Sequence, residues 1–352
     1  MKILIIQQKM IGDVLASSIL FEVLKTELPN AELHYVVNLH TIPVLENNPF
    51  IDKLIVVTPE IEKSKLKFWK FLNLLKNEKY DTVIDVYSKM SSNLITLFSG
   101  AKTKISKQKW YTSFIYTNTF EEQRICNTNK GLAIANRLQL LKPICNTIPK
   151  SISPKIYLTP REIAAAKQFL VQSSINLSQP LFMISVLGSH LNKTYPSEYM
   201  AKLIDSIVGK TQGQILFNYI PKQEKEAKTV YDFCKDSTKK HIYFNVFGKN
   251  LRDFLAITKH CSAVIGNEGG AINMAKAINI PTFTIFSPWI IKEAWNTLED
   301  DKIHVAVHLK DYNSELFKGR SLKELKENTF NLYQQFLPET ITPKLKQYLQ
   351  QF

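Results

Sequence analysis

The sequence predicts an α/β fold of two doubly wound domains, each built on a parallel sheet. Short apolar runs rich in β-branched residues alternate with helical patterns along the chain, as is typical of strands in parallel sheets. The length of 352 residues suits about two domains. The alternation also restarts after a stretch rich in Ser, Pro and Lys at residues 151–159.

The first half begins with an apolar run at residues 2–6, which predicts a buried strand. It leads through Gly12 into a helix that ends before Pro29. A second helix is predicted over residues 65–76, where Leu72 and Leu75 belong to an apolar face. Further strands are expected at 33–37, 53–57 and 81–86.

The second half begins with a predicted helix at residues 160–172. We expect domains at 1–155 and 156–330, and a C-terminal helix at 331–352 that packs back on the first domain. Pro338 and Pro343 are expected to break this tail into pieces. Strands are predicted at 181–186, 214–217, 242–245, 263–265 and 282–286.

The composition is that of a globular protein, with 45% hydrophobic and 22% charged residues. No apolar stretch is long enough to cross a bilayer or to form a signal-peptide core, so we expect a cytoplasmic protein. The net charge of +14 favours anionic partners such as nucleotides, nucleic acid or an anionic membrane, although lysine runs are usually solvated faces. Free thiols are predicted, because no close pairing exists among Cys126, Cys145, Cys234 and Cys261.

A glycine-rich stretch, residues 266–275, follows the apolar run at 263–265 and predicts a strand, a turn and a helix start. Adjacent Gly269 and Gly270 let the backbone approach a ligand closely, and the first helical amides have no intrahelical partner. The stretch therefore has the outline of a phosphate cradle. A tight connection that uses glycine only for packing is the alternative.

Three further candidates follow predicted strands, where open α/β sheets bind ligands and where two facing domains form a cleft. Asp13, behind Gly12, is either a site carboxylate or a helix-terminal acid stabilised by the macrodipole. Lys193 is either a diphosphate ligand or a solvated loop lysine. Glu224 is either a ribose-binding acid or an ordinary first-turn acid.

The motifs together resemble a known family. In their order and spacing they are similar to the heptosyltransferase-like glycosyltransferase family 9, of GT-B architecture, over nearly the whole chain. The motifs are Gly12-Asp13-Val14, the segment Gly188 to Pro196 (Gly-Ser-x-x-x-Lys-x-Tyr-Pro), the segment Gly266 to Ala275 (Gly-Asn-Glu-x-Gly-x-x-Asn-x-Ala), Pro281 and Phe286-Ser287-Pro288.

The resemblance implies roles for these residues. The residue matching Asp13 is the general base that deprotonates the acceptor hydroxyl, and the residue matching Lys193 binds the donor diphosphate. The glycine-rich helix start holds phosphate through its amides. The family commonly has Asp and His where this chain has Glu268, expected to face the donor sugar, and Asn273. Donor binding is accordingly assigned to Ser189, Lys193, Glu224, Glu268, Gly269, Gly270 and Asn273, with Gly12 beside the base.

The resemblance implies an inverting glycosyltransferase that needs no metal or other cofactor. It would move a sugar, by resemblance ADP-linked heptose, to a hydroxyl of a lipopolysaccharide-core or related glycan. A peripheral contact with the inner face of the inner membrane is expected. The alternative is a non-catalytic GT-B protein that binds a nucleotide sugar or a glycan. Nucleic-acid binding is disfavoured, because no recognised binding module is present. The sequence carries no signal for the oligomeric state.

Overall fold

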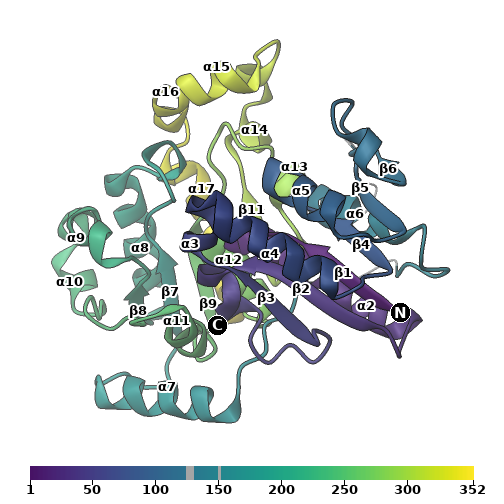
Figure 1. Ribbon diagram of the computed structural model, residues 1–352. Helices are drawn as coiled ribbons and strands as arrows, with labels where there is room; N and C mark the ends of the chain where they lie inside the picture. The colour runs from purple at the N-terminus through teal and green to yellow at the C-terminus, as the bar shows by residue number, and fades with distance from the viewer. Residues whose placement is uncertain (124–130, 150–151) are drawn as a thin grey trace. The chain divides into compact units, whose positions relative to one another are not determined.

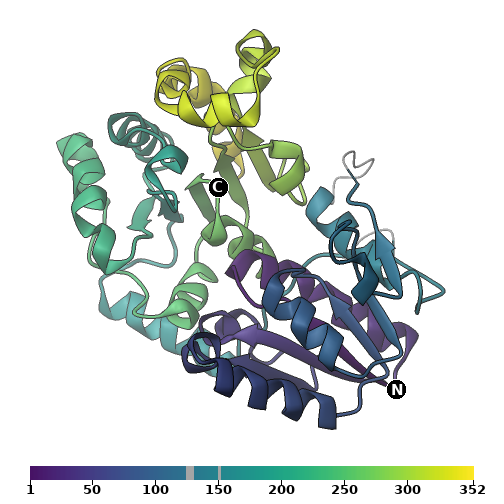
Figure 2. The ribbon, with the colours of Figure 1, turned by 45° about the horizontal axis from the view of Figure 1, so that its top comes forward.

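The computed structural model describes residues 1–123, 131–149 and 152–352 and consists of two compact units, Met1–Tyr157 and Leu158–Phe352. Each unit has one parallel sheet with helices on both of its faces (Figures 1 and 2). The predicted fold class is therefore confirmed. The units divide after Tyr157, whereas the sequence prediction placed the boundary after residue 155.

The first unit has a six-stranded sheet in the order β3-β2-β1-β4-β5-β6. Its strand order reverses between β1 and β4. Two strands were missed, because β5 has the mixed sequence Thr-Lys-Ile-Ser-Lys and β6 has only three residues. The elements are β1 (Lys2–Ile6), α1 (Ile11–Ser17), α2 (Ile19–Glu27), β2 (Glu32–Asn38), β3 (Lys53–Val57), α3 (Pro59–Lys63), α4 (Lys65–Asn77), β4 (Thr82–Asp85), α5 (Met90–Phe98), β5 (Thr103–Lys107), β6 (Asn118–Phe120) and α6 (Leu132–Leu138).

The two faces of this sheet bury apolar side chains against different helices. Leu4 and Ile6 of β1 belong to one buried cluster with Leu72 of α4. On the opposite face, Phe21 of α2 packs against Tyr35 of β2, with ring centroids 4.8 Å apart. Because successive strand residues point to opposite faces, strands buried on both sides read as continuous apolar runs.

The second unit has a five-stranded sheet in the order β11-β10-β9-β7-β8, and its strand order reverses between β7 and β9. Its strands are β7 (Leu181–Ser185), β8 (Gln214–Phe217), β9 (Ala263–Asn267), β10 (Thr282–Ile285) and β11 (His304–Val307). Its helices are α7 (Pro160–Gln172), α8 (Ser197–Thr211), α9 (Glu224–Phe233), α10 (Asp236–Lys239), α11 (Leu251–Thr258), α12 (Gly270–Ala277), α13 (Lys292–Trp295), α14 (Leu309–Tyr312), α15 (Leu322–Glu327), α16 (Thr329–Gln334) and α17 (Pro338–Tyr348).

The strand predicted at residues 242–245 is wrong. Ile242 forms only a single bridge with Ile215, and the chain turns directly afterwards, where the Val246 N–H donates to the Tyr243 carbonyl. The ring of Phe244 packs in an aromatic group beside β8. The last strand of the sheet is instead β11, at the opposite edge.

The C-terminal helix also differs from the prediction. α17 begins at Pro338 but continues through Pro343, so only the first proline marks a boundary. Its residues Ile341 and Leu345 are buried in the core of the second unit, where α17 contacts α8. α17 thus packs within the second unit, and its attachment to the first domain stays a prediction. Pro343 removes one backbone hydrogen bond, and burial of this apolar face offsets the loss.

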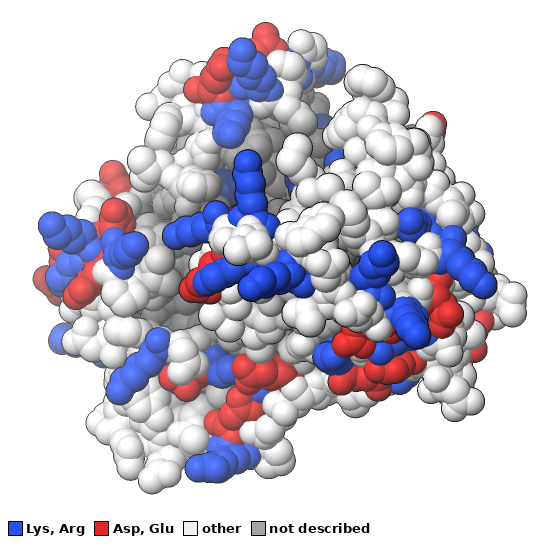
Figure 3. All heavy atoms as spheres, in the orientation of Figure 1, with Lys and Arg blue, Asp and Glu red and all other residues white. Residues whose placement is uncertain are grey.

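Several lysines of the first unit are paired with acids. Lys9 contacts Glu62 at 2.8 Å, and Lys53 contacts Glu78 at 2.7 Å. In the second unit, basic and acidic side chains are likewise mixed over α9 and α10, at the left of Figure 3.

Three of the four cysteines, Cys145, Cys234 and Cys261, are buried free thiols, and Cys126 lies outside the described residues. Burial raises the pKa of Cys145 to about 11 and that of Cys234 to about 12, so both stay protonated. Among the described residues, no helix is both long and apolar enough to cross a membrane.

Candidate active site

The candidate donor site of the second unit lies where its strand order reverses. β7 and β9 are parallel neighbours, with Ser185 opposite Gly266, so the loops that follow them leave the same edge of the sheet. β10, which precedes Ser287, is the next strand along. Three predicted motif segments therefore meet at the carboxyl ends of neighbouring strands, where open α/β sheets bind ligands.

The buried side chain of Asn267 ties the first two loops together. Its Nδ2 donates to the Ser185 carbonyl (2.9 Å), and its Oδ1 accepts the Tyr195 N–H (2.7 Å). The Tyr195 hydroxyl donates to the Phe336 carbonyl (2.6 Å). Pro196 directly precedes α8. Tyr195 and Pro196 therefore fix this loop and lead into α8.

Lys193 and Glu268, both assigned to donor binding from the sequence, form an ion pair. Lys193 Nζ lies 3.0 Å from Glu268 Oε1, and the side chains are 24% and 10% exposed. The Lys193–Glu268 pair is a charge contact rather than an aligned hydrogen bond, because Glu268 Oε1 has no hydrogen-bond partner among the described residues. Lys193 Nζ also lies 5.4 Å from the ring centroid of Trp289. The acid and the indole thus hold the ammonium group beside the start of α12.

The N-terminus of α12 is open. Gly269, at its N-cap, has φ 148°, a conformation that favours glycine, and no side chain caps the helix. A Cβ added to Gly269 would meet nothing within 4 Å, and one added to Gly270 would meet only the Met274 methyl group at 3.8 Å. The first amides of α12 are therefore accessible to an anion.

Two other motif glycines are required by packing. A Cβ at Gly188 would lie 2.3 Å from the Lys193 carbonyl oxygen, and one at Gly266 would lie 2.5 Å from the Ser185 carbonyl oxygen. The close approach of these loops therefore depends on glycine. Packing explains Gly188 and Gly266, whereas it does not explain Gly270.

The remaining donor candidates are near this edge but make fewer contacts. Asn273 lies in the first turn of α12, where its N–H donates to the Gly269 carbonyl. Ser189 is exposed in the loop after β7, and Glu224 is exposed at the first position of α9. The structure joins Lys193 to Glu268 and does not join Ser189 or Glu224 to that pair.

Asp13 lies in the first turn of α1 in the first unit and is held by Arg137. Arg137 Nη2 donates to Asp13 Oδ1 (2.7 Å), and the side chains are 10% and 27% exposed. Among the described residues, no donor contacts the second oxygen, Oδ2. A Cβ added to Gly12 would meet nothing within 4 Å, and Met10, just before the helix, has φ 65°. Asp13 is thus oriented through one oxygen beside open space.

Arg137 was not found from the sequence. It is 124 positions from Asp13, and it also donates to Ser17 Oγ (2.9 Å) and to the Ala133 carbonyl (2.8 Å). The available signal was a single arginine in the otherwise apolar and small segment Leu-Ala-Ile-Ala-Asn-Arg-Leu. Such an arginine is buried only when its charge and donors have partners.

Asp85 was also missed. It ends β4, beside β1, and is fully buried, where it accepts hydrogen bonds from the Ser88 N–H (2.7 Å) and the Tyr116 hydroxyl (2.6 Å). Burial raises the pKa of Asp85 to about 6. An acid that ends an apolar strand next to the reversal point was the signal in the sequence. Its contacts indicate that it supports the loop after β4.

Two Rossmann-like units, each with a parallel sheet whose strand order reverses, define the GT-B class of fold, which the solved structures described below share. The protein-family model for "Glycosyltransferase family 9 (heptosyltransferase)" matches residues 68–323 of this chain. The chain therefore belongs to that family.

Relatives and solved structures agree with this assignment. The chain is 24% identical over 294 residues to lipopolysaccharide heptosyltransferase 1 of Campylobacter coli, covering 81% of this chain and 84% of that protein. A glycosyl transferase family 9 structure from Veillonella parvula matches with a TM-score of 0.83 at 18% identity, over 100% and 98% of the two chains. The Escherichia coli ADP-heptose LPS heptosyltransferase II matches with a TM-score of 0.68 at 17% identity, over 96% and 99%. At these identities, the structures establish the fold.

Proposed function

We propose that this protein transfers a heptose or a closely related sugar from an ADP-linked donor to a hydroxyl of a lipopolysaccharide-core glycan, with inversion at the anomeric carbon. The observation that carries the proposal is the Lys193–Glu268 pair beside the open start of α12. The donor and acceptor classes are taken from the names of the Campylobacter coli and Escherichia coli relatives.

In this proposal the second unit stabilises the leaving group. The bond between the anomeric carbon and the diphosphate oxygen breaks, and negative charge develops on the departing ADP. Lys193 supplies a positive charge, and the free amides at the start of α12 supply hydrogen-bond donors, so both act where charge develops. Glu268 holds the lysine ammonium in place before the donor binds. We propose that these groups act without a metal ion or other cofactor.

The first unit supplies the base. Asp13 accepts the proton of the acceptor hydroxyl while that oxygen forms a bond to the anomeric carbon. Oδ2 is the oxygen proposed to take the proton, because Oδ1 accepts from Arg137. A single displacement from the face opposite the diphosphate inverts the anomeric centre. Arg137 acts as a positioning residue, because it fixes the carboxylate through one oxygen.

We also propose that the protein works in the cytoplasm, in peripheral contact with the inner membrane. Trp110 and Phe114 of the first unit are 89% and 82% exposed, and Lys107 and Lys109 are close to them in sequence. Exposed aromatic and basic side chains suit the interface of an anionic membrane. Sedimentation with anionic vesicles tests this contact, and loss of sedimentation in Trp110→Ala/Phe114→Ala supports it.

Two measurements test the activity. Titration with ADP, UDP, GDP and CDP should show that ADP raises the melting temperature most, because a ligand of the native state stabilises it. ADP-heptose and a heptose-deficient lipopolysaccharide core should then give a transferred sugar, with or without EDTA. Binding without transfer would favour the non-catalytic alternative. Preference for another nucleotide would refute the ADP donor, and loss of transfer with EDTA would refute cofactor independence.

A further inference from the structure

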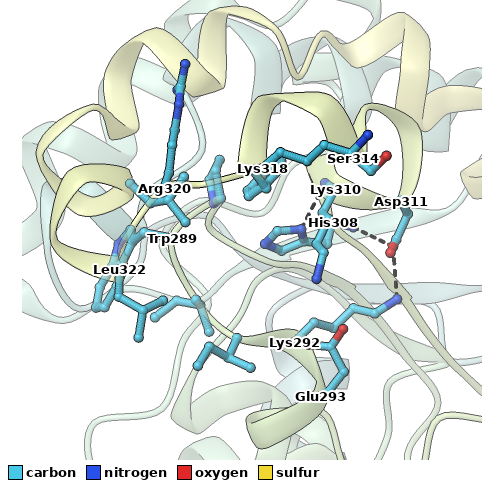
Figure 4. A pocket seen from close by; sticks show the side chains of 15 residues that line it. Trp289, Lys292, Glu293, His308, Lys310, Asp311, Ser314, Lys318, Arg320 and Leu322 are labelled. Carbon is cyan, nitrogen blue, oxygen red and sulfur yellow. Dashed lines mark hydrogen bonds and ion pairs between the residues drawn. The ribbon is translucent and has the colours of Figure 1, made fainter.

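A cavity of about 390 Å³ lies in the second unit, at the carboxyl ends of β10 and β11 (Figure 4). Its lining comes from the loop before α13, from α14 and from the segment that leads into α15. None of the residues assigned to donor binding lines it. The volume is within the range of about 300–1,000 Å³ that is usual for small-molecule sites.

His308 presents an unused hydrogen-bond donor to this cavity. The Lys310 N–H donates to His308 Nδ1 (3.0 Å), so the neutral ring must carry its proton on Nε2. The residue is only 3% exposed, and Nε2 has no partner among the described residues. Figure 4 shows the bonded nitrogen turned toward Lys310 and the other facing the space among the lining side chains. A buried donor of this kind is costly unless a ligand or a water accepts from it.

Burial keeps His308 neutral. Desolvation lowers the pKa of its imidazole below the usual value, with the nearby Lys292 and Lys310 acting in the same direction and the acids Asp311 and Glu293 opposing it. At neutral pH, Nε2–H is therefore a neutral donor. The charge of the cavity must come from its other lining residues.

The lining carries more positive than negative side chains. Its cations are Lys292, Lys310, Lys318 and Arg320, and its acids are Glu293 and Asp311. Lys292 is paired with Asp311 at 2.9 Å and Lys318 with Glu315. Within the described part of the chain, Lys310 and Arg320 have no ion pair, although Arg320 extends away from the other lining side chains in Figure 4. Lys310 is thus the cation best placed for a ligand anion.

The walls of the cavity are apolar. Trp289, Ile290, Phe317 and Leu322 contribute to them. The Trp289 indole is fixed, because Nε1 donates to the Asn192 carbonyl (2.9 Å). Broad aromatic and aliphatic surfaces suit the C–H face of a sugar ring, and the hydrogen-bond donor and cation suit its anionic group.

We propose that this cavity is a second ligand site, for a small anionic saccharide. His308 Nε2–H and Lys310 bind its phosphate or carboxylate, and Trp289 packs on its ring. The site is separate from the proposed diphosphate site, although Trp289 borders both. The inference does not depend on the donor assignment, because it uses neither the Lys193–Glu268 pair nor the start of α12.

The test follows the His308 side chain by NMR in the full-length protein labelled with ¹⁵N-histidine. The probes are glucose 6-phosphate, glucuronate, glucose and inorganic phosphate. We expect the ligand-free protein to show the neutral Nε2–H tautomer. At least one anionic sugar should shift the His308 Nε2 signal saturably, while glucose and phosphate bind at least about tenfold more weakly. Comparison of the two anionic sugars identifies the preferred anion.

Matched variants separate this site from a surface effect. His308→Asn keeps an acceptor for the Lys310 N–H and removes the Nε2 donor, and Lys310→Ala removes the cation. Both should weaken binding of the preferred sugar by about tenfold in calorimetry. Lys323→Ala, outside the lining, should not change it. The proposal is overturned if no probe shifts His308, if both cavity variants bind like the unmodified protein, or if glucose binds as well as the anionic sugars.

Discussion

Asp13 is held by one carboxylate oxygen, and this arrangement separates its proposed role as a base from its role in folding. Asp13→Asn preserves an oxygen that accepts from Arg137 but cannot take a proton. We expect kcat to fall by about 10²–10⁴, the usual contribution of a general base. ADP affinity should be unchanged, and steady-state kinetics together with calorimetry measure both quantities. Full transfer activity in this variant would remove Asp13 from the mechanism.

Arg137→Met provides the control for that experiment. If Arg137 acts only by positioning the carboxylate, its removal should lower kcat in the parent but have little further effect in Asp13→Asn. Residues that act as a unit show such non-additivity. Equal, additive losses would instead indicate a general effect of Arg137 on the stability of α1 and α6.

Lys193→Ala should weaken ADP binding by at least about tenfold, because a charge-assisted contact to the diphosphate is lost. It should also lower stability by about 1–3 kcal/mol, since Glu268 is left partly buried without its counter-ion. The double variant Lys193→Ala/Glu268→Gln should recover the stability but not the affinity. Urea denaturation and calorimetry separate the two effects. Recovery of ADP affinity in the double variant would assign Lys193 a structural role only.

At the residue scale, the sequence was informative where a residue lies within a local motif. Asp13 and Lys193 follow strands directly, so their position at a sheet edge could be predicted. Arg137 and Trp289 could not, because their roles depend on contacts across large sequence separations, to Asp13 and to Lys193. The pairing of Lys193 with Glu268 was likewise invisible, although both residues had been singled out.

At the scale of elements, α7 begins with a capping box in which the Glu162 N–H donates to Thr159 Oγ1 (3.2 Å) and Glu162 also pairs with Arg252 of α11. Arg252 Nε and Nη2 donate to the two carboxylate oxygens at 2.6 and 2.7 Å. The Arg252 guanidinium lowers the pKa of Glu162 to about 2. This pair therefore links the start of α7 to the neighbouring helix.

Since the folded pKa of Glu162 is below its unfolded value, its contribution is present above about pH 4.5 and is lost as the pH falls toward 2. Glu162→Gln should reduce the free energy of unfolding by about 1–3 kcal/mol at pH 7 and by less at pH 3. Denaturation curves at both pH values measure this. Asp232→Asn, in an exposed pair with Lys228, is the control and should have little effect. An equal loss at both pH values for Glu162→Gln would contradict the assignment.

Strands and helices could be predicted from the sequence where their buried positions follow a regular pattern. The strand at residues 53–57 has the predicted bounds because it is an apolar run. The helix at residues 160–172 has the predicted bounds because it begins with Thr-Pro and a capping glutamate. β5 has a single apolar residue, Ile105, between pairs of polar residues, and β11 is only four residues long. Residues 242–245 have the composition of a strand, but tertiary packing places their rings beside β8.

At the scale of the molecule, each unit has its own sheet and buried core, and the proposed diphosphate site lies wholly in the second. We expect the fragment 158–352 to fold and to bind ADP within about threefold of the full chain, because its binding groups are all retained. It should have no transferase activity, since Asp13 is absent. Circular dichroism, calorimetry and a transfer assay measure these outcomes. A folded fragment that does not bind ADP would show that the first unit contributes to donor binding.

The arrangement within each unit was predictable from the alternation of strands and helices, since parallel sheets impose it. The surface against which the C-terminal helix packs could not be predicted in this way. An amphipathic tail with Ile341 and Leu345 on one face requires an apolar partner but does not specify which unit provides it. In the structure, α8 of the second unit provides such a partner.

If ligands approach Gly12 and Gly270 as proposed, the open space around them limits how far this protein can be stabilised without loss of activity. Both glycines lie in helices, where alanine is favoured by up to about 1 kcal/mol, and neither site would force a methyl group against protein atoms. Gly12→Ala and Gly270→Ala should therefore raise the melting temperature and lower transfer. A variant more stable and equally active would show that no ligand approaches that glycine. If both variants behave as expected, the two glycines leave room for a ligand at a cost in stability.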